Sequence, residues 1–166
     1  MNEILAAKIV SAFSETDAHV LRLLRASEKL NTRFPLTEDG FKRLGDDAIE
    51  TLDQFLYRFL KLQDSLATRL FPALRSVLSG DQEPQPFLDT LNQLEKAGIV
   101  PSVQAWMELR ELRNDLAHEY PESVGQTVAT LNRLYERWDE LKTILDNAHR
   151  YHSERIEPLL GGKGGG

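Results

Sequence analysis

The residues best suited to chemistry lie in one short segment near the middle of the chain. It contains Arg113, Asn114, His118 and Tyr120, which supply a permanent cation, an amide, an imidazole that exchanges protons near neutral pH, and a phenol. For a chain with 13 Arg, 4 His and 4 Tyr among 166 residues, Arg followed five places later by His is expected about 0.3 times by chance. Adding Tyr two places further on lowers the expectation to about 0.01, so the full pattern is moderately specific.

Arginine and histidine together favour cleavage of RNA. The 2′-hydroxyl of RNA is itself the nucleophile, so one group must take its proton, another must protonate the 5′-oxygen, and a cation must offset the charge of the phosphorane. One motif supplies a single His118, whereas a two-fold dimer supplies two copies of it and two of Arg113. On a helix these two side chains diverge by about 140°, so the spacing permits them to converge without forcing it.

The pattern formed by Arg113, Asn114, His118 and Tyr120 resembles the HEPN superfamily, specifically the HepT-like proteins encoded beside a minimal nucleotidyltransferase of the MNT type. The resemblance implies a small helical bundle and a metal-independent endoribonuclease toxin that needs no cofactor. It also implies a homodimer with a composite active site, in which Arg113 and His118 are catalytic and Asn114 orients His118 or the phosphate. The nucleotidyltransferase partner, as antitoxin, would transfer AMP onto Tyr120 and silence the nuclease.

Other interpretations of the same residues stay open. The arginine near a helix end pairs with a carboxylate in many proteins, a histidine there favours the helix dipole, and a tyrosine before proline covers core surface. The surroundings of the motif are acidic, with carboxylates at Glu108, Glu111, Asp115, Glu119 and Glu122. A non-catalytic helical subunit that partners a nucleotidyltransferase is therefore an alternative function, and a purely structural adaptor is a third.

Composition sets limits on all of these functions. The length of 166 residues fits one domain, expected over 1–158, followed by a flexible Gly-rich tail over 159–166. The absence of cysteine excludes thiol chemistry, and no apolar run approaches the ~20 residues of a membrane span, so we expect a cytoplasmic protein. The net charge of −6 opposes attraction to a polyanion, so RNA binding requires a local basic patch.

Two sets of basic residues are candidates for that patch. Arg22, Arg25, Lys29 and Arg33 recur at helical spacing, and Arg110 lies one turn before the motif arginine. A solvated helix face is the alternative interpretation of the first set. The set of Asp146, His149 and His152 is expected to be exposed rather than to bind a metal.

The hydrophobic pattern predicts an all-α fold. Apolar residues recur with helical period, and no strict alternation marks a strand. We expect an antiparallel bundle of about five main helices, with a possible break in the first near Ser14–Thr16 and a stop near Pro72. We expect helices over about 3–31, from about 37 onward, over 87–98, from 101 to the motif, and over 124–156.

Overall fold

The computed structural model describes residues 2–117 and 123–161. Of these residues 83% are helical and none is in a strand, which confirms the all-α prediction. The first elements are α1 (Glu3–Leu30), α2 (Glu38–Lys42), α3 (Asp46–Ser65), a π-helical turn η1 (Leu66–Leu70) and α4 (Phe71–Ser79). The later elements are α5 (Phe87–Lys96), α6 (Val103–Ala117), α7 (Val124–Arg137), α8 (Asp139–Tyr151), the π-helical turn η2 (His152–Ile156) and α9 (Glu157–Gly161).

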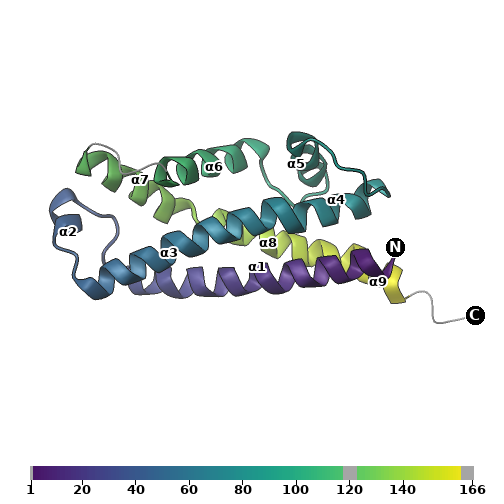
Figure 1. Cartoon of the computed structure of the whole chain (residues 1–166), viewed down its shortest axis with the longest axis horizontal. Coiled ribbons are helices and arrows are strands. Elements are labelled where there is room, and N and C mark those ends of the chain that lie inside the picture. The colour runs from purple at the N-terminus through teal and green to yellow at the C-terminus, as the bar shows by residue number, and fades with distance from the viewer. Residues whose placement is uncertain (1, 118–122, 162–166) are drawn as a thin grey trace, which may run out of the picture.

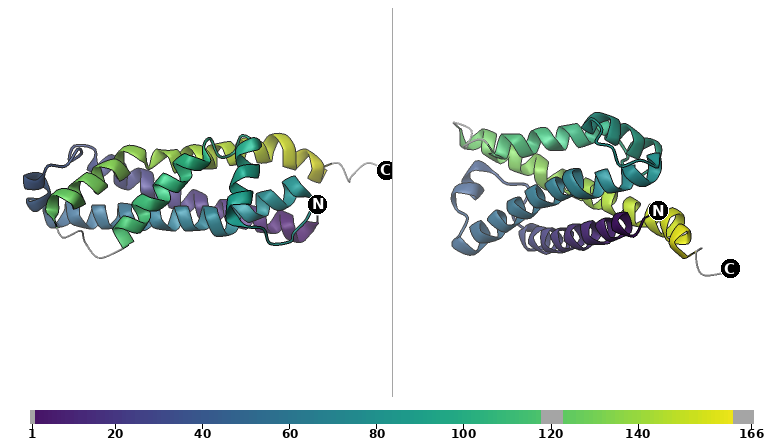
Figure 2. Two further views of the ribbon diagram at one scale, coloured as in Figure 1. Left: turned by 90° about the horizontal axis from the view of Figure 1, so that it is seen from above. Right: turned by 45° about the vertical axis from the view of Figure 1, so that its right-hand side comes forward.

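These elements form an elongated bundle whose long helices alternate in direction (Figure 1). α3, η1 and α4 follow one another without a break, and so do α8, η2 and α9, while only Trp138 separates α7 from α8. α3 lies between α1 on one side and α6 on the other (Figure 1), and the right-hand view of Figure 2 shows the same order. Members of both sets of candidate basic residues line hollows that α3 borders.

The core consists of the apolar stripes that the sequence predicts. Phe55, Phe59 and Leu62 of α3 are fully buried, and Trp106 and Leu109 of α6 pack into the same core. Most apolar residues of α7 and α8 are also buried, and Tyr135 is partly buried. Val10 of α1, by contrast, is 61% exposed.

The predicted break near Ser14–Thr16 is wrong, since α1 is continuous from Glu3 to Leu30. The hydroxyl of Thr16 donates to the carbonyl oxygens of Ala12 at 2.8 Å and Phe13 at 3.1 Å. A threonine that bonds back to the preceding turn satisfies its hydroxyl inside a helix, so it does not cap a new one. Thr37 does act as a cap, but of the short α2, and the long helix starts only after Gly45.

Pro72 does not end its helix, contrary to the prediction. The π-helical turn η1 precedes it, and there the Phe71 N–H bonds to the carbonyl of Leu66, five residues back. The wider turn starts a new helical register, so Pro72 falls in the first turn of α4, where a missing N–H costs little. The continuous helical segment of α3, η1 and α4 therefore extends to Ser79 and ends at Gly80, whose φ of 72° is the left-handed conformation typical of glycine.

The end of the chain differs in part from the predicted tail. α9 continues to Gly161, so the first residues of the segment 159–166 are helical, and residues 162–166 lie outside the described residues. Within 2–117 and 123–161, none of the helices combines the length and the apolar character of a membrane span.

Candidate active site

The motif begins on the last turns of α6. Arg113 and Asn114 belong to this helix, whereas His118 and Tyr120 lie outside the described residues. The start of α6 is fixed by two acceptors: Ser102 Oγ bonds to the Ala105 N–H at 3.1 Å, and the Glu95 carboxylate bonds to the Val103 N–H at 2.6 Å. Its buried side, which includes Trp106, Leu109 and Leu112, fixes the rotation of the helix and thereby the position of Arg113.

Arg113 connects α6 to α3 through an ion pair. Its Nη2 lies 3.0 Å from Asp64 Oδ1, and the side chains of Arg113 and Asp64 are 31% and 50% exposed. Its Nη1 donates to Asn114 Oδ1 at 3.4 Å, while its Nε is buried and has no protein partner among the described residues. The guanidinium is thus oriented by its own chain but still reaches the surface.

Asn114 is exposed and makes only this long hydrogen bond to Arg113 among the described contacts. The contact places its amide beside the motif cation, next to any phosphate that Arg113 binds. The expected orientation of His118 by Asn114 stays a prediction, since His118 lies outside the described residues.

A pocket of 240 Å³ adjoins Arg113 between α3, η1 and α6. The structure brings Arg110 and Arg113 together at this pocket, and the Arg110 guanidinium lies 5.8 Å from the centre of the Phe87 ring. Its other lining residues are Gln63, Asp64, Ala67, Thr68 and Trp106. The predicted pair of arginines near the motif therefore shares one cavity.

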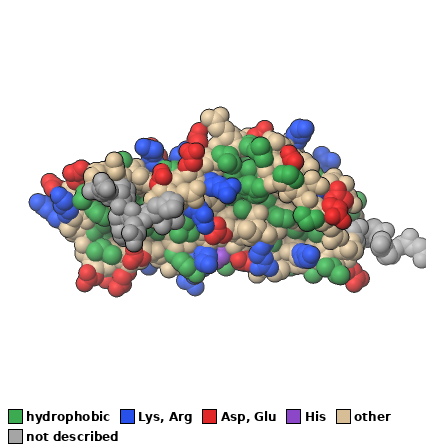
Figure 3. All heavy atoms as spheres, turned by 45° about the horizontal axis from the view of Figure 1, so that its top comes forward, with side chains coloured by type: hydrophobic (Ala, Val, Ile, Leu, Met, Phe, Trp, Pro, Cys, Tyr) green, Lys and Arg blue, Asp and Glu red, His purple; other side chains and the backbone are tan. Residues whose placement is uncertain are grey.

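The acidic residues around the motif are partly accounted for. Glu108 accepts hydrogen bonds from Arg137 at 2.8 Å and from Gln104 at 3.2 Å, so its charge is paired away from Arg113. Glu111 and Asp115 are exposed. Figure 3 shows basic and acidic side chains interspersed on the face of the molecule that carries the upper helices of Figure 1. This face is therefore not a uniformly basic surface.

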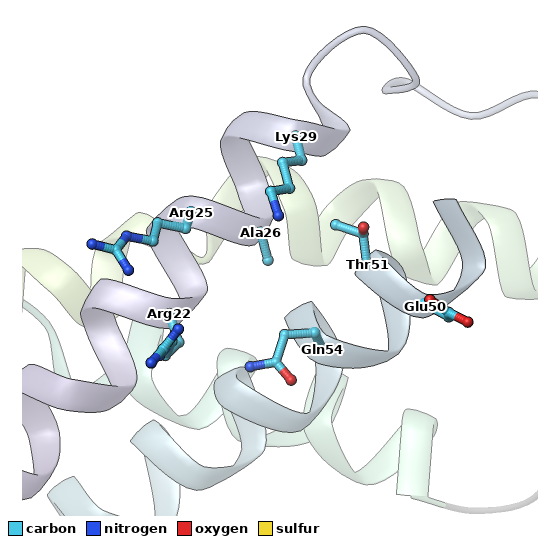
Figure 4. Close-up of a pocket in the computed structure, with 7 residues that line it drawn as sticks. All are labelled: Arg22, Arg25, Ala26, Lys29, Glu50, Thr51 and Gln54. Carbon is cyan, nitrogen blue, oxygen red and sulfur yellow. The ribbon is translucent and has the colours of Figure 1, made fainter. Parts of the chain in front are cut away.

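The predicted basic stripe of α1 lines a different groove. Arg22, Arg25 and Lys29 are exposed and border a groove of 270 Å³ between α1 and α3, opposite Glu50, Thr51 and Gln54 (Figure 4). Lys29 points into the gap between the two helices, and Arg25 extends away from it. Arg33 follows the end of α1 and does not line this groove.

The stripe and the motif are separated within one protomer. Asp64, the partner of Arg113, lies about three turns beyond Gln54 along α3. The structure therefore brings three residues of the stripe together, but it does not bring them to Arg113.

A charged cluster between α1 and α3 has no signal in the sequence. His19 Nδ1 lies 3.0 Å from Arg58 Nη1, and His19 Nε2 lies 3.8 Å from Glu15 Oε1. Glu15 also accepts from Ser65 Oγ at 2.6 Å and pairs with Arg69. Because His19 and Arg58 are 39 residues apart, only the packing of two helices brings them together.

Burial of His19 lowers its pKa, and the positive charges of Arg58 and Lys61 lower it further. As the pH falls below about 6.5, the unfolded chain binds a proton at this position and the folded chain resists it. The contribution of His19 to stability is therefore present above pH 6.5 and decreases on acidification.

We expect His19→Gln to remove this part of the pH dependence. The difference in urea midpoint between native protein and variant should be constant from pH 7 to 8 and should shift in favour of the variant as the pH falls from 6.5 to 5. Both proteins contain the same carboxylates and the same other histidines, so the effect of these groups on stability cancels in the difference. A difference that stays the same at pH 5.5 and 7.5 would show that burial does not perturb His19.

The described residues contain no group of three or more His, Asp or Glu side chains arranged to bind a metal ion. Asp146 pairs with Lys142 at 2.7 Å, His149 with Asp17 at 2.7 Å, and His152 lies 3.4 Å from Glu157. His149 also stacks on Phe13, with ring centres 4.1 Å apart. Each of the three residues considered for a metal site thus has a separate partner.

Comparison with known proteins gives no match: no family model, curated protein or solved structure is similar to this chain.

Proposed function

We propose that this protein is a HepT-like endoribonuclease toxin of the HEPN type, which acts in the cytoplasm as a homodimer and requires no metal. The observation that carries the proposal is the position of the motif cation. Arg113 stands at the end of α6, is fixed by Asp64, reaches the surface, and shares a pocket with Arg110. At this pocket Arg110 and Arg113 outnumber the one carboxylate, Asp64, and this excess of positive charge is what a chain of net charge −6 needs in order to bind RNA.

The proposed reaction uses the dimer. The ribose 2′-oxygen attacks the adjacent phosphorus and loses its proton to neutral His118 of one protomer. The protonated His118 of the partner subunit gives its proton to the departing 5′-oxygen, and Arg113 stabilises the charge on the phosphorane. The P–O5′ bond breaks as the P–O2′ bond forms, which leaves a 2′,3′-cyclic phosphate and a free 5′-hydroxyl.

Regulation in this proposal acts on Tyr120. Its phenol oxygen attacks the α-phosphorus of ATP bound by an MNT-type nucleotidyltransferase, pyrophosphate leaves, and the phenol proton passes to solvent. The attached AMP adds bulk and a negative phosphate two residues from His118. Steric exclusion and repulsion of the substrate phosphate then account for inhibition.

One observation favours a second function, a non-catalytic helical partner of the nucleotidyltransferase. Arg113 already has a carboxylate partner in its own chain, and Glu111 and Asp115 are exposed close to it in sequence. Such a subunit would present Tyr120 to the transferase and would not cut RNA.

The test is cleavage of a single-stranded RNA in the presence of EDTA. We expect the purified protein to cut the RNA, with the activity coinciding with the dimer on gel filtration, and the products to carry 2′,3′-cyclic phosphate and 5′-hydroxyl ends. Products with 5′-phosphate ends, or activity that elutes away from the protein, would contradict the proposed chemistry and favour the non-catalytic partner.

A further inference from the structure

Several buried polar atoms around the pocket beside Arg113 have no hydrogen-bond partner in the protein. Of the five such side-chain atoms among the described residues, four belong to residues that line this pocket. They are both amide atoms of Gln63, the indole Nε1 of Trp106 and the Nε of Arg113. Gln63 is 2% exposed and Trp106 is 1% exposed, so the position of both side chains is fixed by packing. Buried polar groups in folded proteins are normally bonded, so this concentration at one cavity points to a ligand.

The backbone beside the pocket is also unusual. Ala67 and Thr68 line it from η1, the π-helical turn between α3 and α4. Isolated π-helical turns occur frequently at functional sites, because the extra residue displaces side chains from regular helical register. Gln63 lies immediately before this turn, on the last turn of α3. The local backbone thus supports the same interpretation as the unpartnered side chains.

The unpartnered atoms define the chemistry of the ligand. Trp106 Nε1 and Arg113 Nε need acceptors, whereas the amide of Gln63 needs a donor and an acceptor side by side. A simple anion would satisfy the first two groups and leave the Gln63 carbonyl without a donor. A planar ring with adjacent donors and acceptors on its edge offers a partner to each kind of unpartnered atom, and nucleobases present such edges.

Aromatic and cationic groups complete this chemistry. Phe87 lines the pocket and is partly exposed, so its ring is available for a base to stack on. Arg110, which is exposed, and Arg113, which is half-exposed, lie where a phosphate attached to the base would be in reach. The volume of 240 Å³ lies below the ~300 Å³ at which sites for drug-sized ligands begin, so it suits one base with its sugar and phosphate outside.

We propose that this pocket binds a single nucleobase of a ribonucleotide, with Gln63 reading the edge of the base and Arg110 and Arg113 holding its phosphate. The assignment of the base to an RNA strand rests on the proposed ribonuclease function. Binding of a base positions the neighbouring phosphodiester close to Arg113. Base binding itself requires no cleavage and is measurable separately.

The chain offers a direct probe of occupancy. It contains two tryptophans, so Trp138→Phe leaves Trp106 as the only one. We expect AMP, CMP, GMP or UMP to quench the fluorescence of Trp106 in this variant. Gln63→Met, which keeps the side-chain length and removes the amide, should weaken binding about tenfold or more. Gln54→Met is the matched control, because Gln54 lies on the same helix but lines the groove between α1 and α3. The affinity of this variant for the nucleotide should equal that of the parent protein.

Calorimetry on the native chain and on both glutamine variants gives the same comparison without the Trp138 change. Circular dichroism confirms that each variant is folded. Absence of nucleotide binding to the native chain, or equal binding by Gln63→Met and Gln54→Met, would overturn the proposal.

The source of the base is identified with uncleavable RNA. A decamer with 2′-O-methyl riboses lacks the nucleophile, and we expect it to bind more tightly than any mononucleotide and more tightly than the same backbone without bases. Equal affinity for mononucleotide and decamer would assign the pocket to a free nucleotide. If the native chain binds a base but does not cleave RNA in EDTA, the nuclease function is rejected and the assignment of the pocket stands.

Discussion

Replacing Arg113 with alanine is expected to lower the rate of RNA cleavage by about 10²–10³-fold, the usual effect of removing one group that stabilises transition-state charge. The change should have little effect on folding. The ion pair with Asp64 joins side chains that are 31% and 50% exposed, and such pairs contribute about 0–1 kcal/mol. A loss of 1 kcal/mol, the upper end of that range, lowers the Tm by about 2–4 °C in a chain of this length.

The partner of Arg113 supplies the control. Asp64→Asn removes the same ion pair, keeps the shape of the side chain, and leaves the guanidinium in place without its counter-charge. If Arg113 is catalytic, this variant retains or increases cleavage although it loses the same stabilisation. If Arg113 serves only to tie α6 to α3, the two variants behave alike in both activity and Tm. Arg113→Lys should be intermediate, because lysine keeps the charge but not the planar fork of donors.

His118→Ala is expected to have the larger effect and to abolish both cleavage in EDTA and growth arrest on expression. Each proton transfer by a positioned side chain contributes about 10²–10⁴-fold, and in the proposed dimer the substitution removes the base and the acid together. Cell growth on induction and gel-based cleavage of RNA measure the two effects. A non-catalytic partner of a nucleotidyltransferase predicts instead that native protein and variant affect growth equally.

The sequence predicts the helices well because their signal is local. The stripe of Phe55, Phe59 and Leu62 has helical spacing, and burying that stripe against other helices requires no distant information. The sequence-based prediction fails where one local signal is compatible with two different structures. Thr16 is a possible cap, but its hydroxyl bonds to the preceding turn. Pro72 is a possible stop, but a π-helical turn precedes it and places it in a first turn.

The candidate site is predictable only in part. Spacing within one helix identifies Arg113 and its neighbour Arg110, and the structure places both at one pocket. The contributions of Asp64 and Gln63 come from a helix some fifty residues earlier, and no periodicity predicts which carboxylate or amide faces α6. His19 likewise acquires Arg58 as a neighbour only through the packing of α1 on α3. Local pattern thus identifies the motif, and tertiary packing determines its partners.

The central claim is that two chains contribute to one active site, and subunit mixing tests it most directly. Equal amounts of native and His118→Ala protein are mixed, unfolded and refolded together so that heterodimers form. A composite site predicts that only native homodimers cleave, because a heterodimer holds a single His118 and lacks either the base or the acid, so the activity falls to about a quarter of that of the same total amount of native protein. An activity of about a half, as expected if each chain carries a complete site, would contradict it.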